Sequence, residues 1–170
     1  MSHYYAIAVL PPTTADIEGE VARMMEPHRE SDDLSTGWWD WFQIGGRWTG
    51  RLDNGYDPRT DPRNIETCRL CRGTGTRLDI AVANGCNGCR GVGSALKWPT
   101  EWVAAPGNKA RWADVAESVK LEPPYTVVYP EGAAHHEIWD GDAWVEVNEI
   151  DAALSSINGD AIVVVVDYHS

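Results

Sequence analysis

Two segments at opposite ends of the chain have the apolar composition of buried β-strands. Residues 4–10 form a short apolar and aromatic run that Pro11 and Pro12 end, and residues 161–168 are β-branched and apolar at nearly every position. A run that is apolar on both faces is typical of a central strand. We therefore expect residues 161–168 to lie inside a sheet, with the first strand in the same sheet.

Helical spacing of apolar residues appears three times. In residues 13–26 it falls at Ile17, Val21, Met24 and Met25. In residues 108–119 it falls at Trp112, Val115 and Val119, and residues 149–157 precede Gly159, a residue type common just after a helix. This spacing places apolar side chains on one face and predicts three amphipathic helices.

The remaining periodic segments predict further strands. Residues 125–129 alternate and are followed by the turn-forming Pro130, and residues 138–147 suggest a strand or a hairpin broken at Asp140 and Gly141. The order of elements predicts an α+β fold, a small mixed or antiparallel sheet with helices on one face. We expect residues 1–61 and 98–170 to form this domain and residues 62–97 to be an insertion.

The insertion contains all four cysteines of the chain. They form two copies of the word CxxCxGxG, and their positions are Cys68, Cys71, Cys86 and Cys89. Two CxxC pairs at this separation are typical of a structural four-cysteine zinc site, which predicts one structural Zn²⁺ in a zinc ribbon. Two disulfides, or a redox-active CxxC in one copy, are the alternatives.

The eight-residue word resembles the cysteine-rich repeat of DnaJ-type chaperones, over residues 66–95 only. Those proteins carry four repeats and bind two zinc ions, whereas this chain has two repeats and enough ligands for one ion. It also has no His-Pro-Asp tripeptide of a J domain. The resemblance therefore implies metal binding by the four cysteines and no co-chaperone function.

Charge separates the insertion from the rest of the chain. The net charge is −12, yet residues 63–97 contain six basic and two acidic residues, so this segment carries +4 and the remainder −16. A bound Zn²⁺ with four thiolates would leave the segment at about +2. The sequence has no basic leader at its start and no apolar run near the ~20 residues of a membrane span. We expect a cytoplasmic protein without membrane contact.

A tryptophan-rich segment, residues 38–52, contains Arg47 between Gly46 and Trp48. A guanidinium beside indole rings can hold a phosphate or a carboxylate. The alternative is that these tryptophans build a core in which Arg47 pairs with Asp40. In the last strand Asp167 and His169 face one side and could form an orienting pair for a general base, or a polar strand end. Of the adjacent His135 and His136, only one could join such a site.

Three segments together resemble a group of small phage and actinobacterial proteins that mostly lack an assigned function. Residues 44–50 resemble its GGRW(S/T)G motif, residues 125–132 resemble its PYxVVTPDG segment, and residues 165–169 resemble its terminal VVDCH. Two differences are Tyr168 in place of the cysteine and the CxxC insertion. The resemblance implies a phage or prophage setting and places Arg47, His136, Asp167 and His169 at family-like positions, which suggests a shared pocket.

Three functions remain open on these observations. The first is a zinc-binding phage accessory protein that binds, and could inhibit, a host protein. The second is an enzyme for a phosphate-bearing or nucleotide substrate that uses a pocket of Arg47, His136, Asp167 and His169. The third is a nucleic-acid binder that uses Arg69, Arg72 and Arg90. The charge of −16 on the rest of the chain disfavours this function, because affinity for phosphates increases with the number of cations.

Overall fold

The chain divides into two compact units. The computed structural model describes residues 2–30, 37–53, 56, 60–77, 85–96, 107–139, 142–147 and 149–170. Unit 1 consists of Met1–Tyr56 and Glu101–Ser170, and unit 2 of Asp57–Thr100. The units are described separately below. Their helices and strands confirm the predicted α+β class.

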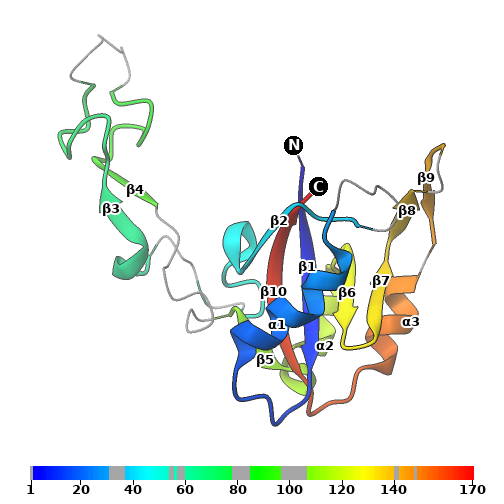
Figure 1. The fold of residues 1–170 in the computed structure, drawn as a ribbon. Coiled ribbons are helices and arrows are strands. Elements are labelled where there is room, and N and C mark those ends of the chain that lie inside the picture. The colour runs from blue at the N-terminus through cyan, green and yellow to red at the C-terminus, as the bar shows by residue number, and fades with distance from the viewer. Residues whose placement is uncertain are drawn as a thin grey trace. The chain divides into compact units, whose positions relative to one another are not determined.

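A six-stranded sheet forms the centre of unit 1 (Figure 1). Its strands are β1 (His3–Leu10), β2 (Trp41–Ile44), β5 (Lys109–Arg111), β6 (Thr126–Tyr129), β7 (Gly132–His135) and β10 (Ile162–His169). The main path runs β2–β10–β1–β6–β7, and β5 pairs with the first part of β10. β1 and β10 are antiparallel over their full lengths, whereas β1 and β6 are parallel, so the sheet is mixed. β10 is central, as its apolar sequence predicts, and β1 lies beside it in the same sheet.

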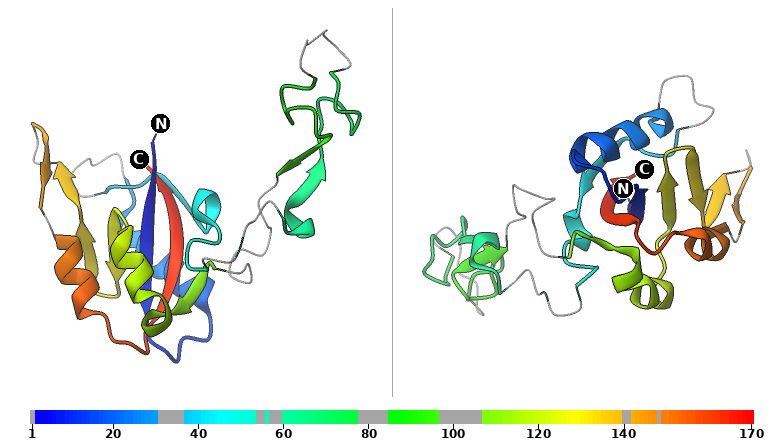
Figure 2. Two further views of the ribbon diagram at one scale, coloured as in Figure 1. Left: turned by 180° about the vertical axis from the view of Figure 1, so that it is seen from behind. Right: turned by 90° about the horizontal axis from the view of Figure 1, so that it is seen from below.

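Helices cover both faces of this sheet, whereas the sequence predicted helices on one face. α1 (Ile17–Met25) packs with Ala6, Val164 and Val166 on one face. α2 (Trp112–Leu121) and α3 (Glu149–Ser156) pack with Val163 and Val165 on the other, as the view from below in Figure 2 shows. The reason lies in β1 and β10, which are apolar on both faces and therefore need a layer on each side.

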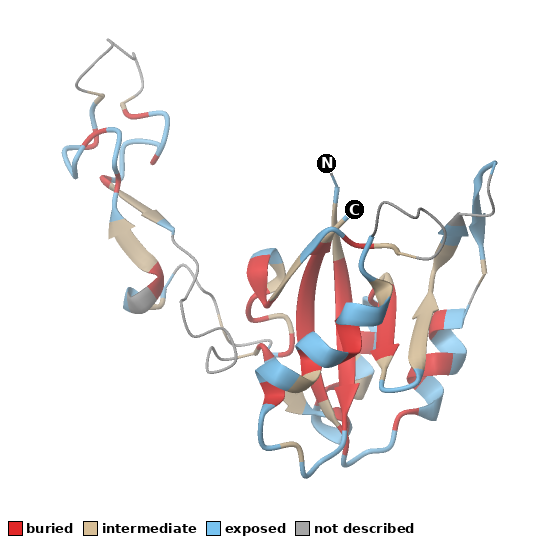
Figure 3. Ribbon diagram, viewed as in Figure 1, coloured by how far each residue is buried: buried red, intermediate tan, exposed pale blue. Residues whose placement is uncertain are grey.

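The apolar side chains that predicted the helices are the ones that pack. Val21, Met24 and Met25 of α1 and Trp112, Val115 and Val119 of α2 are buried. The second helix begins later than predicted, because residues 109–111 pair with β10 as a strand. Figure 3 shows burial concentrated in the central strands. Among the described residues, no helix has both the length and the apolar character to span a membrane.

Short elements complete the two units. In unit 1, β8 (Glu137–Trp139) and β9 (Trp144–Glu146) form the expected hairpin, although its predicted break at Asp140 and Gly141 lies outside the described residues. Two 3₁₀ turns, η1 (Glu26–His28) and η2 (Gly46–Trp48), also belong to unit 1. Unit 2 contains the 3₁₀ turn η3 (Pro62–Asn64) and the paired strands β3 (Ile65–Thr67) and β4 (Ser94–Leu96).

Candidate functional site

The four cysteines meet in a buried cluster in unit 2. Their Sγ atoms all lie within 4.8 Å of one another, an arrangement that could hold a metal ion. Cys68 Sγ is 3.8 Å from Cys86 Sγ, and Cys71 Sγ is 3.7 Å from Cys89 Sγ. A disulfide needs about 2.0 Å between its sulfurs, so all four cysteines are free here. A tetrahedral ion with metal–sulfur bonds of about 2.3 Å would place its sulfurs about 3.8 Å apart, which fits both distances.

The repeat in the sequence is also a repeat in the backbone. Each CxxC pair is followed by an arginine with positive φ, Arg72 at 51° and Arg90 at 53°. Non-glycine residues adopt this conformation infrequently, and the surrounding structure must hold them there. We call these two turns, residues 68–75 and 86–93, the cysteine knuckles.

The two knuckles hold each other through reciprocal main-chain contacts. Cys68 N–H donates to the Gly93 carbonyl at 2.9 Å, and Cys86 N–H donates to the Gly75 carbonyl at 2.6 Å. A side chain at Gly75 would overlap the Gly91 carbonyl, and one at Gly93 would overlap the Gly73 carbonyl. The last glycine of each CxxCxGxG word is therefore required for the knuckles to approach closely enough to bring four sulfurs together.

The thiols in this cluster differ in acidity. Burial raises the pKa of Cys71, but N–H groups of Gly75 and Gly73 and the neighbouring thiols outweigh it and lower the value to about 7. Burial raises the pKa of Cys89 to about 11, and the other thiols raise it as well. The hydrogen bond from Gly93 N–H acts in the opposite direction and lowers this pKa, but does not outweigh them. Gly93 N–H also lies 3.2 Å from Cys89 Sγ. Complete ionisation of the cluster at neutral pH therefore needs a bound cation.

In unit 1, the structure brings Arg47 and Asp167 together through the main chain. Arg47 N–H donates to Asp167 Oδ2 at 2.9 Å, and the Asp167 side chain is fully buried. The Arg47 side chain is exposed and does not pair with Asp40. The GGRW segment therefore presents a main-chain donor to Asp167 of β10, whereas the sequence predicted that the Arg47 guanidinium would join Asp167 in a pocket.

Each histidine at this end of the sheet has its own carboxylate. His3 Nδ1 lies 2.9 Å from Asp167 Oδ1, and His169 Nδ1 lies 2.6 Å from Asp40 Oδ1. Asp167 thus pairs with His3 across the β1–β10 ladder. It does not pair with His169, although Asp167 and His169 lie on the same face of β10. An ionised carboxylate only accepts, so a histidine that bonds to it through Nδ1 must carry its proton on that nitrogen. The two imidazole centroids are 5.5 Å apart.

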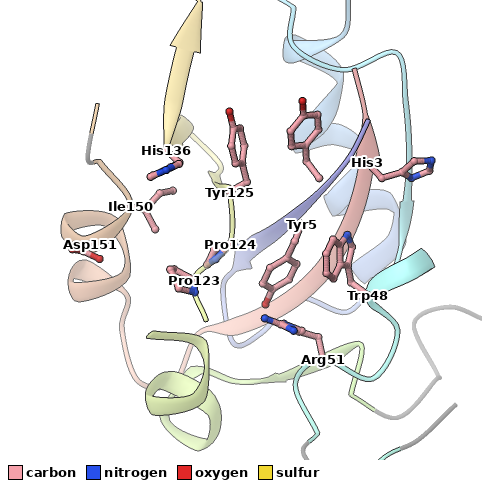
Figure 4. Close-up of a pocket in the computed structure, with 11 residues that line it drawn as sticks. His3, Tyr5, Trp48, Arg51, Pro123, Pro124, Tyr125, His136, Ile150 and Asp151 are labelled. Carbon is pink, nitrogen blue, oxygen red and sulfur yellow. The ribbon is translucent and has the colours of Figure 1, made fainter. Parts of the chain in front are cut away.

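His136 lines a separate cavity of about 540 Å³ (Figure 4). His135 points to the opposite side, where its Nδ1 lies 3.2 Å from Thr126 Oγ1, so only one of the two histidines joins this cavity. Arg47, Asp167 and His169 do not line it. Among the described residues, the expected single pocket of four residues is therefore not formed. His3 contacts Asp167 and also lines the cavity that contains His136.

Sequence reasoning missed His3 and Arg51 as members of these sites. Arg51 lines the cavity, with its guanidinium carbon 5.2 Å from the Tyr5 ring centroid and 5.8 Å from that of Trp48. The sequence contained one indication for His3. Alternate residues of a strand lie on the same face, so His3 lies on the face of β1 that carries Tyr5. Nothing in the sequence alone distinguished Arg51 from Arg47.

The tryptophans of residues 38–52 have different environments. Trp39 is buried, and its Nε1–H donates to the Met25 carbonyl at 2.8 Å. Trp38 and Trp48 are partly buried, whereas Trp41 is 43% exposed. The segment therefore serves mainly as core, on both faces of the sheet. Comparison with family models, curated proteins and solved structures found no match to this chain.

Proposed function

We propose that the cysteine knuckles bind one structural Zn²⁺ through Cys68, Cys71, Cys86 and Cys89. Zinc prefers four thiolates in a tetrahedron, and the 3.7 and 3.8 Å sulfur separations suit its bond length. Four protein ligands fill the coordination sphere and leave no position for a reacting water. The expected role of the ion is therefore to hold unit 2 together, as in a zinc ribbon.

The observation that carries the functional proposal is an exposed apolar residue on each knuckle. Leu70 is 45% exposed and Val92 is 75% exposed, although the knuckles contain few other apolar side chains. Arg69, Arg72 and Arg90 are exposed on the same turns. We call these five residues the knuckle surface. Exposed apolar side chains among cations suit a protein surface that offers an apolar patch and carboxylates.

We propose that the protein is a binding protein whose knuckle surface engages such a partner. The −16 charge on the rest of the chain disfavours a nucleic acid, whose phosphates the remaining carboxylates would repel. In the phage setting implied by the sequence resemblance, the partner would be a protein of the bacterial host, and binding would inhibit it.

The test is a capture experiment with matched variants. Tagged protein is incubated with nuclease-treated host lysate, and retained proteins are quantified by mass spectrometry. The Leu70→Ser/Val92→Ser variant keeps all four cysteines and should lose the partner. Leu121→Ser, at an 83% exposed position in unit 1, is the control and should retain it. Equal retention by both variants, or no stoichiometric partner for the unchanged protein, would contradict the proposal.

A further inference from the structure

We propose that the cavity in unit 1 is a binding site for a small molecule that combines a flat ring with an anionic group, a phosphate or a carboxylate. Its volume of about 540 Å³ lies within the range of roughly 300–1,000 Å³ that is usual for ligand sites. All its lining residues belong to unit 1, so the inference is independent of the metal and of the knuckle surface.

Arg51 is the group that would bind the anion. Its guanidinium lies over the Tyr5 and Trp48 rings, at 5.2 and 5.8 Å from their centroids, which fixes the direction of its donors. One nitrogen, Nη2, contacts Glu122, whose side chain is 69% exposed. A guanidinium has five N–H donors in a planar fork, so donors remain for a second acceptor.

Two polar atoms in the cavity wall are buried without a hydrogen-bond partner among the described residues. They are Tyr5 Oη and Trp48 Nε1. Tyr5 is only 5% exposed, and its phenol points toward the Arg51 side of the cavity (Figure 4). Burial raises the pKa of Tyr5 to about 12 against the opposing effect of Arg51, so the phenol keeps its proton and can donate. A buried donor without an acceptor is costly. Both atoms are shut off from solvent in this conformation, so a bound anion would reach them only if neighbouring side chains, Arg51 among them, moved aside.

The opposite wall suits a ring. The ring centroids of Tyr125 and Tyr4 are 4.8 Å apart. The His136 ring stands edge-on to the Tyr125 ring, with 5.8 Å between their centroids. Pro123 and Pro124 precede Tyr125 and restrict the main chain there. Aromatic walls of fixed position favour a flat ligand because stacking then costs little conformational entropy.

The same geometry disfavours a cationic ligand. An aromatic-lined cavity can bind a cation over its ring faces, but Arg51 already occupies that position over Tyr5 and Trp48. Of the residues that line the cavity, one is acidic, Asp151, and its side chain is exposed. The charged group that the cavity wall offers beside Tyr5 and Trp48 is therefore the Arg51 guanidinium, which Glu122 contacts from outside the lining.

The test uses four probes with the full chain: adenosine 5′-monophosphate, indole-3-acetate, adenosine and inorganic phosphate. Binding is followed by the Trp48 indole N–H resonance and by calorimetry. The proposal predicts that at least one of the two ring-bearing anions binds and shifts this resonance. Binding of adenosine 5′-monophosphate would indicate a phosphate ligand, and binding of indole-3-acetate would indicate a carboxylate ligand. Adenosine and inorganic phosphate should bind at least about tenfold more weakly, since each lacks one half of the recognised chemistry.

Three variants test whether Arg51 binds the anion. Arg51→Gln should weaken binding of the ring-bearing anion at least about tenfold, whereas Arg47→Gln, at an exposed position outside the cavity, should leave it unchanged. Glu122→Gln removes the competing carboxylate at an exposed position and should tighten binding, even if Arg51→Gln fails to fold. The proposal is overturned if neither ring-bearing anion shifts the Trp48 resonance, if adenosine binds as tightly, or if Glu122→Gln weakens binding.

Discussion

The main-chain N–H of Arg47 donates a 2.9 Å hydrogen bond to Oδ2 of Asp167, a fully buried carboxylate 120 positions later in the chain. Oδ1 of the same carboxylate contacts His3 at 2.9 Å. Asp167 thus fastens the GGRW turn and the first strand to the last strand. A buried carboxylate is costly unless both oxygens have donors, and here both have one.

Gly46→Ala should destabilise unit 1 by about 2–4 kcal/mol. Gly46 has a φ of +52°, and a side chain there would overlap the Asp167 carboxylate. The control is Gly132→Ala, where an added Cβ meets nothing within 4 Å, and its effect should stay within about 0.5 kcal/mol. Urea denaturation of the two variants measures this difference, and equal stabilities would show that the close approach of Gly46 to Asp167 is unimportant.

Asp167→Asn should lower the free energy of unfolding by about 2 kcal/mol. The single amide oxygen would accept from Arg47 N–H, so the NH₂ group would face His3 Nδ1, and His3 would have to change tautomer to accept from it. Both contacts would also lose the strength that an ionised acceptor gives them. Asp114→Asn also removes one negative charge, but at a 63% exposed position, and serves as the control. Thermal denaturation should separate the two variants, and similar losses would assign the effect to charge alone.

More of the hydrophobic core than of the candidate site could be predicted from the sequence. The apolar pattern predicted β10 as a central strand and Val21 and Val115 as helix residues that face the core. It could do so because buried positions are occupied by apolar residues at a spacing that depends on the type of element. The placement of helices on both faces follows from the same apolar strands and was still predicted wrongly, because strand order decides which face each helix reaches.

The site depends on contacts between segments that are far apart in the chain. The cysteine cluster could be predicted because its ligands lie within a local repeat, with spacing that reflects metal geometry. The pairing of His3 with Asp167 depends on the register of β1 against β10, and the role of Arg51 depends on the packing of Tyr5 and Trp48. Neither register nor packing is visible in a single sequence.

Acidification from pH 7 to pH 5 should destabilise unit 1 partly through His135. Burial lowers the pKa of His135, and nearby His28 adds to this while Glu149 opposes it. The unfolded chain therefore takes up the proton first as the pH falls through the ordinary histidine pKa of about 6.5, so the free energy of unfolding decreases there. His135→Asn should show a shallower loss across this range in urea denaturation, and a slope equal to that of the unchanged protein would contradict this.

Metal removal should unfold unit 2 and leave unit 1 folded. The buried cluster of unit 2 consists of the four cysteines with Ala95 partly buried against it, which is too little apolar surface to replace the ion. After chelation, amide resonances of residues 60–77 and 85–96 should collapse to unfolded positions, while those of β1 and β10 should stay. Added Zn²⁺ should restore the first set. Unchanged resonances in unit 2 after complete removal would mean that the fold of the knuckles does not need a metal.

Native mass spectrometry of the purified chain, with elemental analysis of the bound metal, tests the central claim most directly. The account predicts one Zn²⁺ per chain with all four cysteines reduced, and loss of the ion in Cys71→Ser. A metal-free chain whose mass is reduced by the hydrogens lost from two disulfides would contradict it, as would full zinc occupancy in Cys71→Ser.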